Sequence, residues 1–260
     1  MLVNERYSSE LPSKQAAIDV FSGRWTSGFP TESGLSSGGV VPLFDDPRIA
    51  HLIDRLGASI VGIDAVELGP LEGGHSYSLI RAGVGKLLAI EGNSFCYLKT
   101  LVTKEVLELT NLQVEYGEIE KWLDAENTKF GLIVASGILY HFVDPLRALV
   151  NMTRRSDTVF LWTHYFDDEA MPAGDYRRVP FSGRVTTAEH MGYVAEYYWR
   201  SYLGAQTTDL FNGGVHDTSV WMSRKGIFDT FSRAGFDVEE SFVAGDHVNG
   251  PSACFLARRR

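Results

Sequence analysis

From residue 60 onward, short apolar runs alternate with amphipathic stretches, and this alternation constrains the fold more than any other feature of the sequence. Each run is too short for a helix and is followed by turn-forming residues, which is typical of strands. Strands are expected at 63–68, 86–90, 112–116, 130–136 and 158–163, with helices at 74–82, 95–109, 119–125 and 145–153. This repetition predicts right-handed βαβ units, and therefore an α/β, doubly wound, mostly parallel sheet with helices on both faces.

Three segments lie outside this rhythm. Residues 1–59 are rich in Gly, Ser and Pro but contain spaced aromatic residues, so we expect an irregular arm, with a helix at 47–56, that packs on a core domain of residues 60–260. Residues 165–222 are rich in aromatic residues and are interpreted as an insertion over one edge of the sheet, with a helix near 187–202. A helix at 223–234 and an antiparallel hairpin of 237–243 with 253–258 are expected to follow.

Charge and cysteine content argue against several classes of protein. The formal net charge of −9 disfavours a nucleic-acid partner, because binding to a phosphate backbone needs concentrated positive charge. No apolar run approaches the ~18–20 residues needed to cross a bilayer, and the first residues lack the pattern of a signal peptide. The two cysteines, Cys96 and Cys254, form no CxxC or Cys/His array. We therefore expect a cytoplasmic protein without a disulfide or a metal site.

The most informative segment is VELGPLEGGHS, residues 66–76. A buried strand is expected to end at Leu68, a tight turn to use Gly69 and Pro70, and a helix to begin near Gly73. In an open parallel sheet, this first strand–helix turn is where an adenosine-bearing cofactor lies. Small residues let the backbone approach the cofactor, and the helix N-terminus offers unpaired N–H groups.

The same turn indicates which cofactor to expect. It lacks the G-x-G-x-x-G pattern of dinucleotide-binding proteins and has Leu71 and the acidic Glu72 where a pyrophosphate would approach. A carboxylate there would repel a diphosphate, whereas the ammonium and sulfonium groups of S-adenosylmethionine would favour an acidic rim that includes Glu67. We therefore expect S-adenosylmethionine, with a nicotinamide-dependent dehydrogenase as the competing interpretation.

Three further turns are expected at the same crevice. Glu91 follows the second strand, where an acidic side chain can accept hydrogen bonds from both ribose hydroxyls. Glu118 follows the third strand, where it can accept from the adenine amino group or cap the next helix. The fourth strand ends at Ser136. The cofactor-binding candidates are Glu67, Gly69, Pro70, Leu71, Gly73, Glu91, Gly92, Asn93, Gly117, Glu118, Ile119 and Ser136.

With strand-ELGPLEGG-helix, strand-E, strand-GE and strand-ASGILYHFVDP in this order, the sequence resembles the class I S-adenosylmethionine-dependent methyltransferases over residues 60–165. The resemblance implies a Rossmann-like, seven-stranded sheet with an antiparallel last strand, and adenosyl contacts at Gly69, Pro70, Glu91, Glu118 and Ser136. The sequence departs from the family pattern at Leu71, where Gly is frequent, and at Glu118, where Asp is more frequent. The end of the fourth strand, SGILYH, resembles both small-molecule methyltransferases and the wobble-uridine enzymes that transfer a carboxymethyl group to tRNA.

In this fold the methyl acceptor lies over the carboxyl ends of the fourth and fifth strands, where His141 and His164 are expected. For a hydroxyl acceptor, either imidazole can act as a base near neutral pH, or each can be a packing residue. We predict O-methylation of a small organic molecule beneath a lid formed by residues 165–222. The alternatives are a tRNA methyl or carboxymethyl transferase and a non-catalytic cofactor-binding module of the same fold, and a homodimer is left open.

Overall fold

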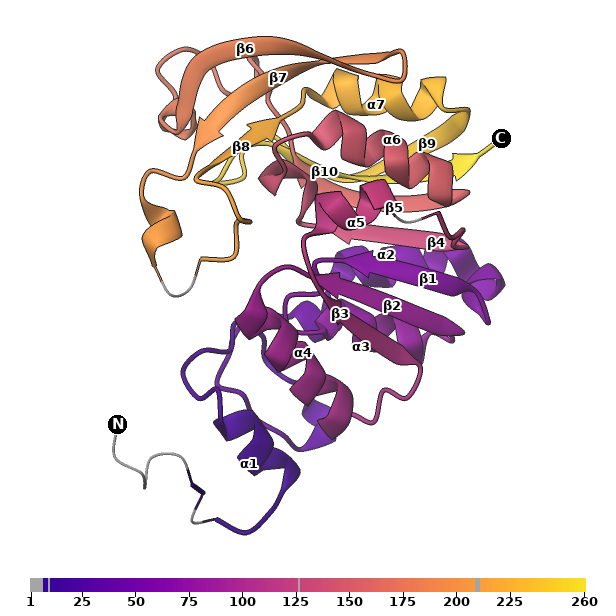
Figure 1. Ribbon diagram of the computed structural model, residues 1–260, viewed down its shortest axis with the longest axis vertical. Coiled ribbons are helices and arrows are strands. Elements are labelled where there is room, and N and C mark those ends of the chain that lie inside the picture. The colour runs from indigo at the N-terminus through magenta and orange to yellow at the C-terminus, as the bar shows by residue number, and fades with distance from the viewer. Residues whose placement is uncertain (1–6, 9, 126, 209–210) are drawn as a thin grey trace.

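The computed structural model describes residues 7–8, 10–125, 127–208 and 211–260. At its centre lies a seven-stranded sheet in the order β3-β2-β1-β4-β5-β10-β9 (Figure 1). Strands β1 to β5 pair in parallel, and β10 runs antiparallel to both β5 and β9. This confirms the predicted sheet with its antiparallel last strand. The strands are β1 (Asp64–Leu68), β2 (Lys86–Glu91), β3 (Leu112–Tyr116), β4 (Leu132–Ser136), β5 (Thr158–His164), β9 (Phe236–Ala244) and β10 (Ser252–Arg259).

Helices cover both faces of the sheet, because the central strands carry apolar side chains on both sides. Val66 and Leu68 of β1 belong to the core cluster that includes residues of α5, α6 and α7, whereas Ala65 belongs to the cluster that includes residues of α2 and α3. The α-helices are α1 (Lys14–Asp19), α2 (Pro47–Leu56), α3 (Gly74–Arg81), α4 (Ser94–Val106), α5 (Ile119–Ala125), α6 (Pro145–Arg155) and α7 (Arg224–Arg233). Short 3₁₀ turns are η2 (Thr31–Ser33), η3 (Leu43–Asp45), η4 (Gly57–Ile60), η5 (Leu139–His141), η6 (Tyr176–Arg178) and η7 (Ala205–Thr207).

Side-chain caps fix where the crevice loops end and their helices begin. Asn93 caps α4, its Oδ1 accepting the N–H groups of Phe95 at 2.9 Å and Cys96 at 3.1 Å. Asp46 and Asp144 cap α2 and α6, and each is followed by a proline at the first helical position. Proline is favoured there because its fixed φ suits the helix and its missing N–H has no partner to lose.

The insertion differs from its prediction. Instead of a helix near 187–202, the chain forms an antiparallel sheet of β6 (Phe181–His190), β7 (Tyr193–Ser201) and β8 (Thr218–Trp221). The turn between β6 and β7 has two residues with positive φ, Met191 at 51° and Gly192 at 81°, as a tight hairpin requires. The flanking β-branched and aromatic residues fit a pleated surface better than a helix, so the prediction of a helix was wrong. This sheet packs over α6 and α7 (Figure 1).

The part of the arm that the structure describes is held by a row of aromatic rings. Ring centroids are 6.0 Å apart for Phe21 and Trp25, 5.2 Å for Trp25 and Phe29, and 5.0 Å for Phe29 and Phe44. Phe44 then contacts Tyr77 of α3 at 5.7 Å. Edge-to-face contacts of this kind add to the stabilisation from burial alone. The arm is therefore joined to the helix that follows the glycine turn.

Both cysteines are free and buried, as expected of small apolar side chains. No helix within the described residues has the length and apolar character needed to cross a membrane.

Candidate functional site

A cavity of about 130 Å³ lies where β2, β3 and β4 end at the carboxyl edge of the sheet. Its walls bring together six residues predicted from the sequence, drawn from turns far apart along the chain. These are Glu91, Gly92, Asn93, Glu118, Ile119 and His141. Eight residues outside the predicted site complete the lining: Glu120, Ile138, Phe142, Phe211, Asn212, Gly214, Val215 and His216.

Glu91 is the acidic group at the centre of this site. Its side chain is buried, with Oε1 accepting the N–H of Asn93 at 2.8 Å and Oε2 accepting the N–H of Leu71 at 3.1 Å. Burial raises the pKa of Glu91 to about 7, and the backbone hydrogen bonds only partly oppose that rise. A buried carboxylate fixed at the C-terminal end of β2 can accept hydrogen bonds from two neighbouring hydroxyl groups.

Gly69, Pro70, Leu71 and Gly73 of the glycine turn are not among the residues that line the cavity, but the turn contacts two residues that are, Ile138 and Glu91. Gly69 has φ +71°, and a Cβ added to it would be 2.9 Å from Cδ1 of Ile138, which lines the cavity. Leu71 has φ +57°, a backbone conformation that residues other than glycine rarely adopt. Its N–H donates to the carboxylate of Glu91. Gly73, at φ +82°, is the N-cap of α3. The turn after β1 therefore needs glycine at position 69, where it meets the residues that follow β4.

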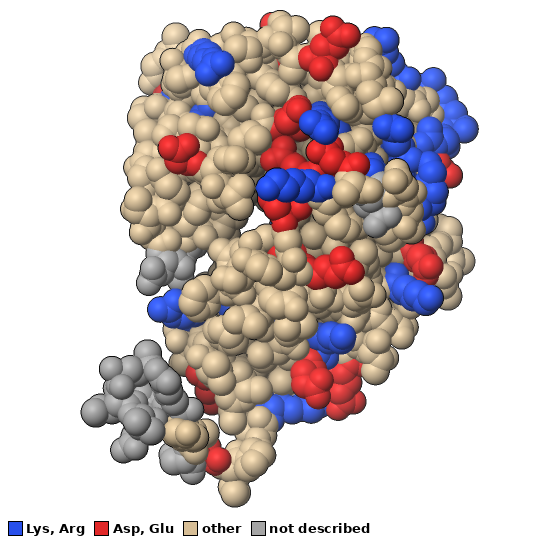
Figure 2. Space-filling model, viewed as in Figure 1, with Lys and Arg blue, Asp and Glu red and all other residues tan. Residues whose placement is uncertain are grey.

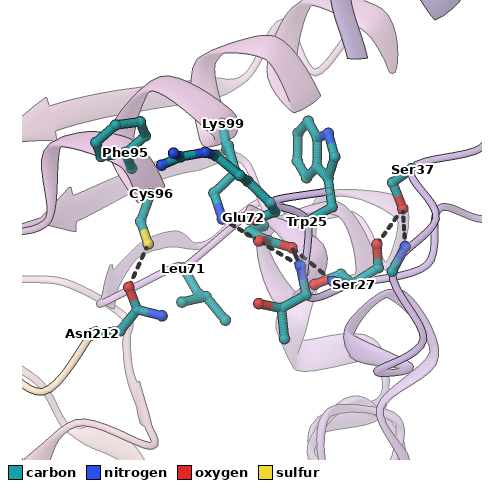
Figure 3. Close-up of polar contacts among 12 residues, drawn as sticks. Trp25, Ser27, Ser37, Leu71, Glu72, Phe95, Cys96, Lys99 and Asn212 are labelled. Atoms are coloured by element: carbon teal, nitrogen blue, oxygen red, sulfur yellow. Dashed lines mark hydrogen bonds and ion pairs between the residues drawn. The ribbon is translucent and has the colours of Figure 1, made fainter. Parts of the chain in front are cut away.

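Glu72 does not face the cavity, which corrects the sequence analysis. Its side chain is fully buried and pairs with Lys99 of α4 (Figure 3). Its oxygens also accept the N–H groups of Thr26 at 2.9 Å and Ser27 at 2.8 Å. The charge is compensated within the protein, so Glu72 gives no reason to exclude a diphosphate. Its partners show instead that the glycine turn is joined to the arm.

Glu67 lies behind the turn rather than on an open rim. It is fully buried, accepts a hydrogen bond from the hydroxyl of Ser76, and its Oε1 is 3.6 Å from Nδ1 of His75. Burial raises the pKa of Glu67. His75 in turn contacts Asp46 at 2.9 Å. Burial opposes ionisation of Asp46, but hydrogen bonds from His75 and Arg48 hold its pKa well below the usual value.

Two buried oxygens in this region have no hydrogen-bond partner among the described residues. They are Oε1 of Glu67 and Oγ of Ser136, on the neighbouring strands β1 and β4. Buried polar atoms are nearly always paired in folded proteins, so two such atoms near one turn indicate a place for a polar ligand. Both residues were predicted to bind the cofactor, and their unpaired acceptors fit a ligand that donates hydrogen bonds.

Glu118 and Asn93 both have structural duties as well as lining the cavity. The carboxylate of Glu118 accepts the N–H groups of Glu120 at 2.9 Å and Lys121 at 2.7 Å, so it caps α5. The N–H of Gly117 donates to the carbonyl oxygen of Glu91 at 3.0 Å, which ties the two turns together. Asn93 donates from Nδ2 to the carbonyl oxygen of Phe211 at 3.2 Å.

The segment 211–216, part of the region predicted to form a lid, lines the cavity, but its particular contacts were not predicted. Asn212 contacts Asn93 at 3.2 Å. It also accepts a hydrogen bond from the thiol of Cys96 at 3.3 Å (Figure 3). These contacts join residues more than a hundred positions apart, and no local pattern in the sequence marks them.

His141 lines the cavity and has a defined tautomer. The hydroxyl of Tyr202 donates to the carbonyl oxygen of Gly213, so its oxygen accepts from Nδ1 of His141, 2.8 Å away. Burial lowers the pKa of His141 to about 3, and the nearby charge of Arg200 adds to this effect. The imidazole is therefore neutral, with an unprotonated Nε2.

His164, at the end of β5, is neutral for similar reasons. Its Nδ1 donates to the carbonyl oxygens of Gly250 at 2.8 Å and Pro251 at 3.3 Å. Burial lowers the pKa of His164 to about 4, with His247 as a further cause. His164 does not line the cavity described above, but its ring is 4.8 Å from that of Tyr140, which is 4.2 Å from His141.

A larger hollow, of about 630 Å³, lies at the opposite end of the sheet. Lys129, Arg155 and Arg259 are among its lining residues, near the amino ends of β4 and β5. In Figure 2, lysine and arginine gather along the side of the molecule on which the C-terminus lies. A polyanion bound there would lie away from Glu91 and the crevice. Among the described residues, no group of three or more His, Cys, Asp or Glu side chains could hold a metal ion.

Comparison with known proteins identifies the fold. Neither the family models nor the curated proteins that were searched give a match. Among solved structures, the N-terminal domain of EvdMO1 with SAH (S-adenosylhomocysteine) bound is 20% identical, with a TM-score of 0.68 over 95% of this chain and 94% of that domain. In the longer EvdMO1 structure, the match covers 46% of that chain.

Two further structures agree. The magnesium protoporphyrin IX methyltransferase ChlM from Synechocystis PCC 6803, with bound SAH, is 12% identical, with a TM-score of 0.57 over 95% of this chain and all of that one. An O-methyltransferase family protein from Burkholderia thailandensis is 10% identical, with a TM-score of 0.51 over 82% of this chain and 55% of that one. The chain therefore has the Rossmann-like fold of class I S-adenosylmethionine-dependent methyltransferases.

Proposed function

We propose that this protein is an S-adenosylmethionine-dependent methyltransferase that acts on a small organic acceptor, with oxygen as the methylated atom. The observation that carries the proposal is the position of Glu91. This buried carboxylate, at the C-terminal end of β2, lines a cavity together with residues that follow β3 and β4. Two structures of the same fold contain SAH, the product of the methyl donor, which supports this choice of cofactor.

The residues around the crevice suit the parts of that cofactor. Glu91 would hold the ribose hydroxyls, while Glu118, Gly117 and Ile119 would contact the adenine. Gly69, Pro70, Leu71 and Gly73 would let the backbone approach, with Gly92 and Asn93 beside the ribose. The unpaired oxygens of Glu67 and Ser136 would accept hydrogen bonds from the ammonium group. When bound, the cofactor supplies an electrophilic methyl group on a sulfonium.

What the protein adds to methyl transfer is mainly position and the exclusion of water. Residues 165–222 are proposed as the acceptor lid, and segment 211–216 already covers the cavity. His141 or His164 would accept the proton of an acceptor hydroxyl at Nε2, since Nδ1 is a donor in each ring. Their low pKa values make both imidazoles weak bases before the acceptor binds.

The relatives leave the acceptor open. One similar domain was crystallised in the presence of SAH and D-fucose, and another structure is a magnesium protoporphyrin IX methyltransferase. D-fucose and magnesium protoporphyrin IX are both small molecules, which supports the proposed substrate class. The division into an arm of residues 1–59 and a domain of 60–260, the homodimer and the cytoplasmic location stay predictions.

Calorimetry with S-adenosylmethionine and SAH tests the cofactor. We expect both to bind the wild-type protein and Glu115→Gln, a control on the exposed side of β3, and to bind Glu91→Gln at least about tenfold more weakly, since a hydrogen bond to a charged group is lost. Equal binding by Glu91→Gln would refute the role of Glu91.

Turnover and tRNA-binding assays distinguish the proposed function from the two alternatives. Binding without turnover on any acceptor would favour a non-catalytic module, and retardation of bulk tRNA at low salt would favour a tRNA-modifying enzyme. His141→Gln and His164→Gln test the base: unchanged turnover in both variants would remove that assignment.

A further inference from the structure

Arg200 of β7 is a half-buried guanidinium without an anion beside it. Its Nε is buried and has no hydrogen-bond partner, and within the described residues no ion pair of its guanidinium is found. It lies over two aromatic rings, with Cζ 5.4 Å from the ring centre of Trp221 and 5.7 Å from that of Tyr202. Cation–π contacts stabilise such a cation but do not satisfy its N–H donors.

The rings around Arg200 form a box that carries no negative charge. His164 stacks on Trp221 with centroids 5.2 Å apart, and His141 stacks on Tyr202 at 5.9 Å. Tyr140 joins the two pairs, 4.2 Å from His141 and 4.8 Å from His164. We call these five residues the Arg200 box.

Each ionisable member of the box is held neutral. Burial raises the pKa of Tyr140 to about 12 and also raises that of Tyr202. The two imidazoles are uncharged, as described above. The other charged group near Tyr140, Arg48, is already paired with both oxygens of Asp46. His247 lies 4.8 Å from His164 and supplies no anion.

Two other shielded arginines each pair with a carboxylate. Arg48 has Asp46, and Arg177 has Asp175 at 2.7 Å. Removing a guanidinium from water without a counter-charge is unfavourable, and the favoured partners of its planar fork are carboxylates and phosphates. Arg200 therefore has the chemistry of an anion site whose anion is not part of the protein.

We propose that Arg200 binds an anionic group of the methyl acceptor, a carboxylate or a phosphate, inside the Arg200 box. The position follows from His141, which belongs both to the box and to the cavity that contains Glu91. An anion on Arg200 would place the rest of a small acceptor beside the crevice. This inference rests on the proposed methyltransferase function, whose substrate class it narrows.

The same contact would prepare the imidazoles. The charge of Arg200 contributes to the low pKa values of His141 and His164, so an anion that neutralises it would raise both values. Binding of the acceptor would thereby strengthen the base that its hydroxyl needs.

The test uses two anions as probes, benzoate for a carboxylate and inorganic phosphate for a phosphate. Binding is followed by NMR of the imidazole groups and by tryptophan fluorescence. We expect a saturable response of His141 and His164 to at least one probe in the wild-type protein, and a dissociation constant at least tenfold higher in Arg200→Gln. Arg233→Gln is the matched control, because Arg233 of α7 lies over the ring of Tyr193 at 5.4 Å, outside both the box and the lid, and the substitution should leave binding unchanged.

The probe that binds identifies whether the anionic group of the acceptor is a carboxylate or a phosphate. Arg200→Lys keeps the charge without the fork and should bind with intermediate affinity, which provides a second variant if Arg200→Gln does not fold. Equal responses in wild type and Arg200→Gln, or no saturable response to either probe, would overturn the proposal. SAH calorimetry is run on the same samples: failure of wild type to bind SAH counts against the methyltransferase, whereas loss of anion binding with SAH binding intact counts against the Arg200 site alone.

Discussion

Lys99 provides the sharpest test of how the glycine turn is held. Its ammonium pairs with Glu72, and the two side chains are only 5% and 0% exposed. Lys99→Met removes the cation and leaves a buried carboxylate with backbone N–H partners only. Breaking a buried pair in this way costs about 3–5 kcal/mol, which for a chain of this size corresponds to a fall in Tm of about 10 °C.

The assay is urea unfolding followed by tryptophan fluorescence, since Trp25 lies 5.8 Å from the Lys99 ammonium. Lys225→Met is the control, because it breaks an exposed pair with Asp229 and should cost less than about 1 kcal/mol. The double variant Lys99→Met/Glu72→Gln should recover part of the loss, because no charge then stays buried. The reasoning is refuted if Lys99→Met costs no more than Lys225→Met.

Three further predictions concern the crevice and its surroundings. In the folded protein the pKa of Glu91 is about 7, above its ordinary value of 4.5. The free energy of unfolding should therefore fall by about 3 kcal/mol as pH rises between these two values. Unfolding free energies measured against pH should show this fall in wild type and not in Glu91→Gln. Gly69→Ala should destabilise the protein by more than the roughly 1–2 kcal/mol that an alanine costs in a left-handed conformation, because its Cβ would also meet Ile138. Gly34 has a similar φ and open space around it, so Gly34→Ala should show the backbone cost alone in the same unfolding assay. Burial raises the pKa of Cys96 and of Cys254 to about 12, so neither thiol should react with iodoacetamide in the native protein at mildly alkaline pH, and mass spectrometry that finds rapid labelling would contradict this.

The sheet and much of its crevice could be predicted because their signals are local. Each strand of the parallel half is a short apolar run, and each is followed by the turn residues that meet at one edge of the sheet. Glu91, Asn93 and Glu118 come together for this reason alone, since parallel strands bring their carboxyl ends to the same side.

Partners from distant parts of the chain could not be predicted. Glu72 lies within the glycine turn, so its sequence neighbours suggest a residue facing the cofactor, but its buried position is set by Lys99 and Thr26. Arg200 gave no signal either, because its surroundings come from β5, β8 and η5.

The error over residues 187–202 has a different cause. Gly192 lies between two runs rich in β-branched and aromatic residues, a pattern typical of a hairpin turn, so the information was present in the local sequence.

The place of β10 between β5 and β9 has a consequence for how the chain assembles. His164 and Ser252 are register partners, and the insertion, α7 and β9 all lie between them. Closing so long a loop is entropically costly, so we expect β10 to dock late and slowly. Until it does, β5 presents an unpaired edge with Val159, Phe160 and Leu161, the kind of edge that pairs with other chains. Refolding yield should therefore fall steeply as protein concentration rises.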